Sequence, residues 1–311
     1  MKFSLIVPVY KNEESIERLL NVLESMSKSI NGELEVVFVV DGSPDRSYEI
    51  LRAALNLLSF PAQLLVHSRN FGSFPAIRTG LSAARGEYFG VMAADLQEPP
   101  ELFSSMFELL VSNECDVVIG TRTSRDDKFS SRVASDIFWW AYRKFVITDM
   151  PKGGVDVFGC NQRFRDELLR LEESRSSLIA LIFWLGFRRK IVSYKRVARQ
   201  EGKSAWTTRK KIDYMTDSVF AFTDLPIRML IRIGAVGTAT AIAIGLSVIA
   251  AHFMGAIQVP GYAPTVLLVL AMGGVNLFGL GLVGSYAWRG YENSKKRPLA
   301  VIASQISNEK S

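Results

Sequence analysis

The chain has 311 residues, a net charge of +6 and a positive mean hydropathy, although 22% of its residues are charged. This length is enough for one large domain or two modest ones. No groove-reading motif or basic repeat occurs, which argues against a nucleic-acid partner. Two distant histidines argue against a histidine-based zinc site, and two cysteines without paired spacing fit a reducing compartment.

Charged residues are spread through residues 1–232 and almost vanish over residues 233–288. This distribution predicts a polar part joined to an apolar part. Basic residues cluster at 188–190, 209–211 and 295–297. Basic runs beside apolar spans are typical of an anionic membrane surface or of phosphate-bearing ligands. A signal peptide is not expected at the amino terminus, because the apolar run Phe3–Val9 is short and charged residues follow it.

The first half of the chain alternates short apolar runs with helical patterns. The apolar runs predict buried strands at residues 4–7, 34–40, 63–67, 88–93 and 116–119. Leucine spacing predicts helices at residues 15–26, 47–58, 76–84 and 100–111. Such alternation predicts an α/β fold, in which a mostly parallel sheet is covered by helices on both faces.

Polar residues come directly after several of the predicted strands. They are Asp41 to Ser43, Ser68 to Asn70, Asp95 to Gln97, and Thr121 with Arg122. Ligands in open α/β sheets bind at the carboxyl ends of the strands, so these side chains are expected to converge on one rim. The sequence therefore predicts a binding site along that rim.

Two apolar stretches near the carboxyl terminus each exceed the ~20 residues that a helix needs to cross a bilayer. Residues 233–257 and 263–288 are predicted as transmembrane helices joined by a short external turn. Lys and Arg flank both outer ends, which predicts that both termini are cytoplasmic. A buried helical hairpin would need more polar faces. We therefore expect a two-helix anchor, multi-pass in the cell (inner) membrane, followed by a basic cytoplasmic tail at residues 289–311.

Two further segments have an amphipathic or apolar character. Residues 209–232 mix apolar residues with Lys, Arg and Asp, which predicts amphipathic helices at the membrane surface. Residues 178–187 are rich in leucine and aromatic residues and are expected to pack in the core. Glycines in the second span would let helices approach closely and form a homo-oligomer. Glycine is also simply common in membrane helices, and both readings stay open.

Three motifs carry a resemblance to a known family. They are Ile6-Val7-Pro8-Val9-Tyr10, Asp41-Gly42-Ser43-Pro44-Asp45, and Asp95-Leu96-Gln97-Glu98-Pro99-Pro100-Glu101. In this order they resemble family 2 glycosyltransferases, and the nearer likeness is to the polyprenyl-phosphate branch, with bactoprenol glucosyltransferases and dolichyl-phosphate mannose synthases. The likeness continues through residues 68–72, 120–122, 199–206 and the two-span tail. It implies a GT-A fold, which is Rossmann-like, in a cytoplasmic catalytic domain over residues 1–208.

The resemblance also implies a reaction. A nucleotide diphosphosugar would give its sugar, with inversion, to undecaprenyl or another polyprenyl phosphate at the cytoplasmic membrane face. UDP-glucose is the first choice of donor, while GDP-mannose and UDP-linked galactose, amino sugars or aminoarabinose derivatives stay open. A processive polysaccharide synthase is disfavoured, because no Gln-x-x-Arg-Trp segment occurs. A catalytically silent, nucleotide-binding membrane scaffold is the alternative outside enzymology.

Donor binding is assigned to the first motifs and to a later basic loop. The carboxylate of Asp41 can accept hydrogen bonds from a nucleobase or a ribose, although Asp-Gly-Ser also suits a turn or a helix cap. By resemblance, Pro8, Tyr10 and Glu13 complete the nucleoside pocket. Segment 199–206 resembles the family's loop over the diphosphate, and otherwise reads as a tight structural turn. Its expected donor-binding residues are Arg199, Lys203, Ser204 and Trp206.

The third motif is the expected metal site. By resemblance, Asp95 and Gln97 bind Mg²⁺ or Mn²⁺, which neutralises the charge of the leaving diphosphate, and Asp95 thereby also serves donor binding and catalysis. The family usually has two aspartates separated by one residue. Here Ala93 replaces the first of them, and Glu98 is a further acid within reach.

The acceptor side is assigned to one aspartate and three arginines. Asp156 lies where the family places its acid near the reacting centre, and it would orient the acceptor phosphate or act as a base. An ordinary loop aspartate is the alternative. Arg122, Arg125 and Arg132 would hold the lipid phosphate, since guanidinium groups match phosphate geometry, although scattered surface arginines are the default reading.

Overall fold

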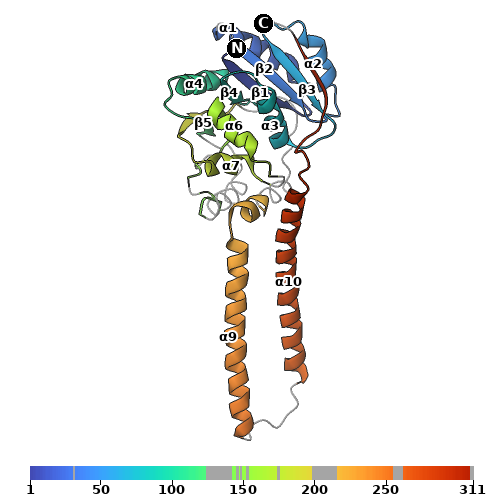
Figure 1. Cartoon of the computed structure of the whole chain (residues 1–311), viewed down its shortest axis with the longest axis vertical. Helices are drawn as coiled ribbons and strands as arrows, with labels where there is room; N and C mark the ends of the chain where they lie inside the picture. Colours follow the sequence, from blue (N-terminus) through green and yellow to red (C-terminus); the bar gives the residue numbers. More distant parts are fainter. Residues whose placement is uncertain are drawn as a thin grey trace.

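The computed structural model describes residues 1–30, 32–123, 142–144, 147, 149–151, 154–173, 176–197, 216–254 and 262–308. Figure 1 shows an α/β part from which two long helices, α9 and α10, project on the same side. The segment that follows α10 returns to the α/β part (Figure 1).

The described strands form one mixed sheet, in the order β7-β5-β6-β4-β1-β2-β3-β8. The strands are β1 Phe3–Val9, β2 Leu34–Val40, β3 Ala62–His67, β4 Tyr88–Val91, β5 Val117–Arg122, β6 Val157–Asn161, β7 Arg189–Tyr194 and β8 Ile302–Ser307. Strands β1 to β4 pair in parallel, as do β5 and β7. Strand β6 is antiparallel to β4 and β5, and β8 is antiparallel to β3. The sequence indicated β1 to β5 but not the last three strands.

Helices cover both faces of this sheet, as predicted. The helices are α1 Ile16–Ser29, α2 Ser47–Leu55, α3 Ser73–Ala83, α4 Pro100–Val111, α6 Gln162–Arg170, α7 Leu178–Trp184, α9 Leu225–Phe253 and α10 Tyr262–Ser294. Successive strand residues point to opposite faces. Leu5 therefore packs in the core under α1, α2 and α4, whereas Ile6 packs in the core under α3, α6 and α7. Helix α7, within the segment predicted to be core, is buried along most of its length.

The long helices are strongly apolar. Among the described residues, the segment Leu225–Ser247 of α9 is long and apolar enough to cross a membrane, and it is not buried inside the protein. Helix α10 exposes Leu268, Val269, Leu277, Phe278, Leu280 and Val283. The helices approach each other near the α/β part, where a Cβ on Gly279 would lie 3.4 Å from Cδ1 of Leu230. One candidate span is thus found, and the two-helix membrane anchor stays a prediction.

The predicted basic tail contains a strand, β8, that completes one edge of the sheet. Just after it, the side chain of Asn308 accepts a hydrogen bond from the Ala62 N–H (2.6 Å) and donates to the carbonyl groups of Leu55 and Phe60 (3.0 Å each). Strand β8 leads from α10 to the carboxyl terminus at the far end of the α/β part (Figure 1). Since β3 is antiparallel to β8, β3 and the strands parallel to it end on the side of the long helices.

Candidate active site

The loops after β1 and β2 are bonded to each other at this end of the sheet. Three backbone N–H groups of the first loop donate to side chains of the second, at 2.8 to 3.2 Å, and join Lys11 to Ser43, Asn12 to Ser47 and Glu13 to Asp45. The predicted donor residue Glu13 accepts in return from the N–H of Arg46 (3.0 Å). Pro8 and Tyr10 are half-buried beside these bonds. Two predicted nucleoside-binding loops are thus joined into a single hydrogen-bonded unit.

The surroundings of Asp45, in the loop after β2, favour its ionised form. Burial raises the pKa of Asp45, but hydrogen bonds from the hydroxyls of Ser43 and Ser47 and from the N–H groups of Glu13 and Ser47 outweigh burial. The pKa of Asp45 consequently lies below its ordinary value. A charged acceptor with this many donors holds the loops in place at neutral pH.

Asp41 is buried and bonded to the loop after β3. Its Oδ1 accepts from the N–H of Phe71 (2.9 Å) and lies 2.8 Å from Nδ1 of His67, while its Oδ2 accepts from the N–H of Gly72 (2.7 Å). This geometry supports the reading of Asp41 as a turn and loop anchor. A carboxylate oxygen can accept two hydrogen bonds. Oδ2 can therefore still receive one donor from a ligand.

A glycine is required at position 42, because the loops after β2 and β3 approach each other closely there. The φ of Gly42 is +56°, and a Cβ at this position would lie 2.3 Å from the carbonyl carbon of Arg69 and 2.4 Å from the nitrogen of Asn70. Only glycine fits there without moving backbone. The Asp-Gly pair of the motif is thus explained by loop packing as well as by any ligand.

On the other side of the sheet's centre, two side chains hold Asp156. Arg122 and Tyr194 are register partners at the ends of β5 and β7. Nη2 of Arg122 donates to Oδ1 of Asp156 (2.7 Å), and the Tyr194 hydroxyl donates to Oδ2 (3.1 Å). Burial, together with the negative charges of Asp156 and Glu98, raises the pKa of Tyr194 well above its ordinary value. The phenol therefore stays protonated and continues to donate.

A strained turn follows β4 and carries the acidic motif. Leu96 has φ +53°, which is uncommon for a residue with a side chain, and it separates half-buried Asp95 from buried Gln97 and Glu98. The amide oxygen of Gln97 accepts from Nη2 of Arg196, and its backbone oxygen accepts from the N–H of Val197 (3.0 Å). The turn is thus tied to the segment that follows β7.

Glu98 is 3% exposed, and its environment disfavours a negative charge. Burial, followed by the charges of Asp95 and Asp156, raises the pKa of Glu98 to about 7, although Arg196 acts in the opposite direction. The backbone of Ala93 acts in the same direction as Arg196 and lowers the pKa of Glu98. The carboxylates of Asp95 and Asp156 therefore lie close enough to Glu98 for their charges to act on it.

Known proteins resemble the chain over almost its full length. The family model described as glycosyl transferase family 2 matches residues 4–170. The chain belongs to this family. The putative glycosyltransferase CsbB of Bacillus subtilis is 30% identical over 96% of this chain and 90% of its own. The prophage bactoprenol glucosyl transferase homolog of Escherichia coli K12 is 29% identical over 97% and 98%, respectively.

A solved structure, S. aureus TarS 1-349 in complex with UDP-GlcNAc, aligns with 19% identity and a TM-score of 0.47 over 71% of this chain and 66% of that one. That likeness is too slight to say anything about ligands. The family assignment rests on the sequence matches, and the mixed α/β sheet with its covering helices is GT-A-like. The protein is a glycosyltransferase of family 2.

The acidic rim of this glycosyltransferase fits a hard divalent cation. Among the described residues, no three His, Cys, Asp or Glu side chains make a metal site by themselves. One oxygen of Glu98, Oε2, is nevertheless buried with no hydrogen-bond partner in the described part of the chain. Carboxylate oxygens suit Mg²⁺ or Mn²⁺, and Mg²⁺ commonly uses one or two carboxylates with substrate phosphates. Gln97 is a weaker candidate ligand than predicted, because Arg196 already donates to its amide oxygen.

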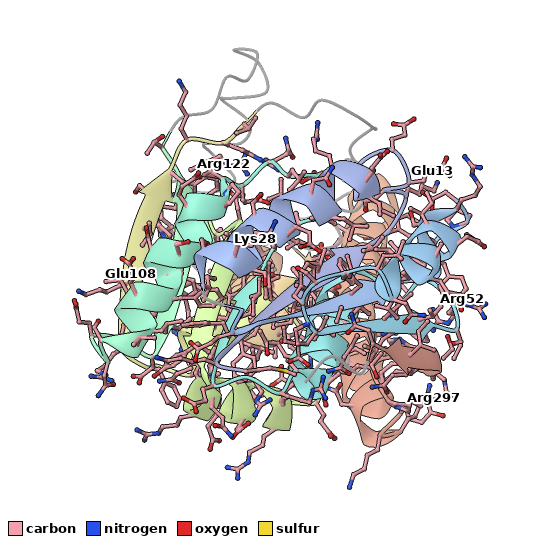
Figure 2. The ribbon with its side chains drawn as sticks, turned by 90° about the horizontal axis from the view of Figure 1, so that it is seen from above. Glu13, Lys28, Arg52, Glu108, Arg122 and Arg297 are labelled. Carbon is pink, nitrogen blue, oxygen red and sulfur yellow. The ribbon has the colours of Figure 1, made fainter. Side chains whose placement is uncertain are left out.

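The structure brings together only part of the predicted site. Asp95, Gln97, Asp156 and Arg122 gather at one rim, through the contacts given above. In the view of Figure 2, Glu13 lies near the start of α1, and Arg122 lies apart from it, toward α4. Six predicted residues lie outside the described residues: Arg125, Arg132, Arg199, Lys203, Ser204 and Trp206.

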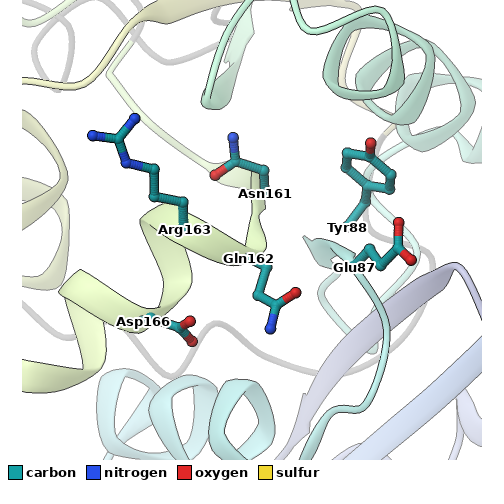
Figure 3. Close-up of a pocket in the computed structure, with 6 residues that line it drawn as sticks. All are labelled: Glu87, Tyr88, Asn161, Gln162, Arg163 and Asp166. Atoms are coloured by element: carbon teal, nitrogen blue, oxygen red, sulfur yellow. The ribbon is translucent and has the colours of Figure 1, made fainter.

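Sequence reasoning missed Tyr194 and Arg196, which bond directly to predicted site residues. A signal was available, since Ile191, Val192 and Tyr194 form a short β-prone run, and Arg196 follows it by two residues. The hollow in Figure 3 was not predicted either. It lies at the start of β4 and the end of β6, and its lining residues are Glu87, Tyr88, Asn161, Gln162, Arg163 and Asp166. It is therefore at the opposite end of β4 from the acidic turn.

Proposed function

We propose that this glycosyltransferase moves glucose from UDP-glucose onto undecaprenyl or a related polyprenyl phosphate at the cytoplasmic membrane face. One observation carries the proposal: the similarity to proteins named bactoprenol glucosyl transferases includes the long helices as well as the sheet. It covers 98% of this chain and 99% of the protein from Shigella phage SfV, at 28% identity. An acceptor held in the membrane by a lipid is consistent with this similarity, because it extends over the apolar helices as well as the sheet.

The exposed surfaces of α9 and α10 support a membrane anchor. Apolar side chains face outward along both helices, and a soluble protein rarely exposes so large an apolar surface. At the α/β end of α10, Trp288 and Tyr291 lie next to each other and the Lys295 ammonium lies over both rings. Aromatic and basic residues of this kind are typical of the membrane–water interface. The carboxyl rim of the sheet lies on the same side as these helices.

The proposed organisation follows from these features. Residues 1–208 are the cytoplasmic catalytic domain, and residues 209–232 are the juxtamembrane segment. Residues 233–257 and 263–288 are the two spans, and residues 289–311 return to the cytoplasm, where β8 joins the catalytic sheet.

In the proposed reaction, the acceptor phosphate attacks the anomeric carbon and the nucleoside diphosphate leaves from the opposite face, which inverts the configuration. A phosphate monoester is already ionised near neutral pH, so a strong base is not required. Asp156 orients the acceptor and takes up a remaining proton. Arg122 is proposed to bind the phosphate, and its buried Nε, which has no partner among the described residues, supports this role. A bound Mg²⁺ or Mn²⁺ would neutralise charge on the departing diphosphate.

The donor is proposed to lie across the two halves of the rim. Pro8, Tyr10 and Glu13 surround the nucleoside, and Asp41 offers one remaining acceptor position on Oδ2. The basic segment 199–206 is proposed, from its sequence, to contribute cations to the diphosphate.

The reaction is tested with purified, detergent-solubilised protein, undecaprenyl phosphate, Mn²⁺ or Mg²⁺, and radiolabelled UDP-glucose. We expect label to move into an organic-extractable lipid from which mild acid releases glucose. Parallel assays with GDP-mannose, UDP-galactose and UDP-linked amino sugars test the donor. A product with one of these alone would replace glucose, and absence of labelled lipid with every donor would overturn the proposed acceptor.

The membrane arrangement is tested by thiol labelling, since both native cysteines, Cys115 and Cys160, are buried. A membrane-impermeant maleimide is added to intact cells that express either Gln258→Cys or Ser294→Cys. We expect labelling at position 258 in intact cells and at position 294 only after lysis. Equal behaviour of the two positions would contradict two spans with a cytoplasmic catalytic domain.

A further inference from the structure

We propose that Glu98 is the second protein carboxylate, beside Asp95, that binds a divalent cation at the acidic rim. In this arrangement Glu98 takes the place of an acidic side chain at position 93, where the chain has alanine. The inference rests on the proposed function in one respect, because the phosphates of a nucleoside diphosphate would complete the set of oxygen ligands.

The first support is the position of the Glu98 carboxylate. The backbone of Ala93 favours the charged form of the Glu98 carboxylate, so this carboxylate lies near residue 93, across the turn. The φ of +53° at Leu96 belongs to this reversal of the chain. Because residue 93 is alanine, it brings no carboxylate of its own. The Glu98 carboxylate lies near it instead.

The second support is an acceptor atom without a donor. Glu98 is 97% buried, and its Oε2 has no hydrogen-bond partner among the described residues. A buried carboxylate oxygen without a donor is costly, and natural proteins rarely retain one that has no function. Asp95 and Asp156 are the acids whose charges act on this carboxylate, so the atom lies in the acidic rim and not in an apolar part of the core.

The third support is the charge balance of the rim. Asp95, Glu98 and Asp156 are accompanied, in the part of the chain that the structure describes, by the guanidinium groups of Arg122 and Arg196. Arg122 is paired with Asp156, which leaves Arg196 beside two carboxylates. Arrival of a diphosphate would add further negative charge. A divalent cation corrects this imbalance, whereas Arg196 alone does not.

Arg196 as the sole counter-ion of Glu98 is the competing explanation. Its charge acts favourably on Glu98, although its Nη2 bonds to Gln97. The two explanations differ in what removal of the Glu98 charge does. If Arg196 were the counter-ion, Glu98→Gln would lower stability and leave cation affinity unchanged. If Glu98 binds a cation, the same change lowers cation affinity and does not lower the stability of the cation-free protein.

The experiment uses the full chain in detergent, with and without UDP. Binding of Mn²⁺ is followed by electron paramagnetic resonance of the free ion, and the thermal unfolding midpoint is measured with and without MnCl₂. For Glu98→Gln we expect about a tenfold or greater loss of Mn²⁺ affinity and loss of the Mn²⁺-induced rise in the unfolding midpoint. Ala93→Asp in the Glu98→Gln protein is expected to restore Mn²⁺ affinity at least in part.

Glu101→Gln is the matched control, because Glu101 is an exposed acid on the following helix turn. It should bind Mn²⁺ as the unaltered chain does. Wild-type Mn²⁺ affinity in Glu98→Gln would overturn the proposal, and so would absence of Mn²⁺ binding by the unaltered chain with UDP. These measurements need neither sugar transfer nor acceptor lipid, so a failure of the proposed reaction would be seen separately in the glycolipid assay.

Discussion

The rim at the carboxyl ends of the strands has two halves: the loops after β1, β2 and β3, and the loops after β4, β5 and β7. The halves differ in how many of their polar groups are hydrogen-bonded to other groups of the protein. After β1, β2 and β3, the loops bond to each other through Ser43, Asp45 and Asp41, with short hydrogen bonds to backbone N–H groups. After β4, β5 and β7, charges of both signs are buried, and Glu98 and Arg122 each retain an atom without a partner among the described residues. Within the described residues, the first half is therefore fully hydrogen-bonded without a ligand, whereas the second half is not.

This difference indicates a division of labour. A self-bonded rim holds its shape before the nucleotide arrives, which reduces the entropy lost on binding. Partly unsatisfied charges are costly to fold and are characteristic of sites that complete their bonding with a ligand. We therefore expect substitutions in the first half to affect stability mainly, and substitutions in the second half to affect turnover mainly.

The largest effect is expected in the second half, from Asp156→Asn. This change keeps the shape of the side chain but removes the charge that Arg122 and Tyr194 hold. We expect kcat to fall by about 10²- to 10⁴-fold, measured as glycolipid formed in single turnover. Asp166→Asn, on the exposed side of α6, should leave kcat unchanged. Full turnover of Asp156→Asn would remove Asp156 from the reaction.

In the first half, Gly42→Ala is expected to act on stability. Its Cβ would overlap the backbone of Arg69 and Asn70, in addition to the strain of a positive φ. We expect a loss of about 3 kcal/mol in the free energy of unfolding, measured by chemical denaturation. Gly32→Ala is the control, since Gly32 also has a positive φ (+76°) but nothing within 4 Å of a Cβ. Equal losses at both positions would show that the loop contact is unimportant.

A smaller effect on turnover is expected from Tyr194→Phe. The change removes one hydrogen bond to Asp156 and leaves the bond from Arg122. We expect kcat to fall about tenfold, which is about 1.4 kcal/mol, with KM for the donor little changed. Tyr88→Phe, at the far end of β4, should have normal kcat. A change in KM alone would show that Tyr194 contributes to donor binding and does not position Asp156.

The smallest effect is a pH dependence of stability from Glu35, inside β2 in the self-bonded half. Burial raises its pKa, but bonds from the Arg85 backbone and from the Gln63, Arg85 and Ser4 side chains outweigh burial and lower it below 4.5. A lowered pKa in the folded state contributes stability above the unfolded value, and this contribution is lost as pH falls through the folded value.

We therefore expect the unfolding midpoint to fall as pH drops below 4.5, and the pH dependence to be weaker in Glu35→Gln. The midpoint is followed by circular dichroism from about pH 6 to pH 3. Glu33→Gln, at an exposed position just before β2, should keep the dependence of the unaltered chain. An unchanged slope in Glu35→Gln would assign acid unfolding to other carboxylates.

Much of the fold was predictable, because β1 to β5 and their helices have the apolar periodicity of elements buried on one or both faces. All seven residues of β2 are buried, and their near-continuous apolar run identified it. Strand β8 has the opposite character, since most of its residues are exposed and only its pairing with β3 makes it a strand. Such edge strands depend on a partner far away in sequence, which local periodicity cannot reveal.

The candidate site was predictable where a polar residue directly follows a strand, as Asp41, Asp95 and Arg122 do. What they bond to was not. The carboxylate of Asp41 is used largely by a loop 30 residues away, and Gln97 is bonded to Arg196. The position of Arg196 is set by the packing of β7 beside β5, strands that pair although they are distant in sequence. Tyr194 entered the site for the same reason.

The return of the chain into the sheet through β8 has a mechanical consequence. The α/β part is attached to the helical pair at two places: through the segment before α9, and through residues 295–301, which lead from α10 to β8. Arg289 adds a brace at the base of α10 by bonding to Asp217 (2.8 Å). A body mounted at two points cannot pivot freely about either one. The height and tilt of the rim relative to α9 and α10 are therefore restrained at both attachments.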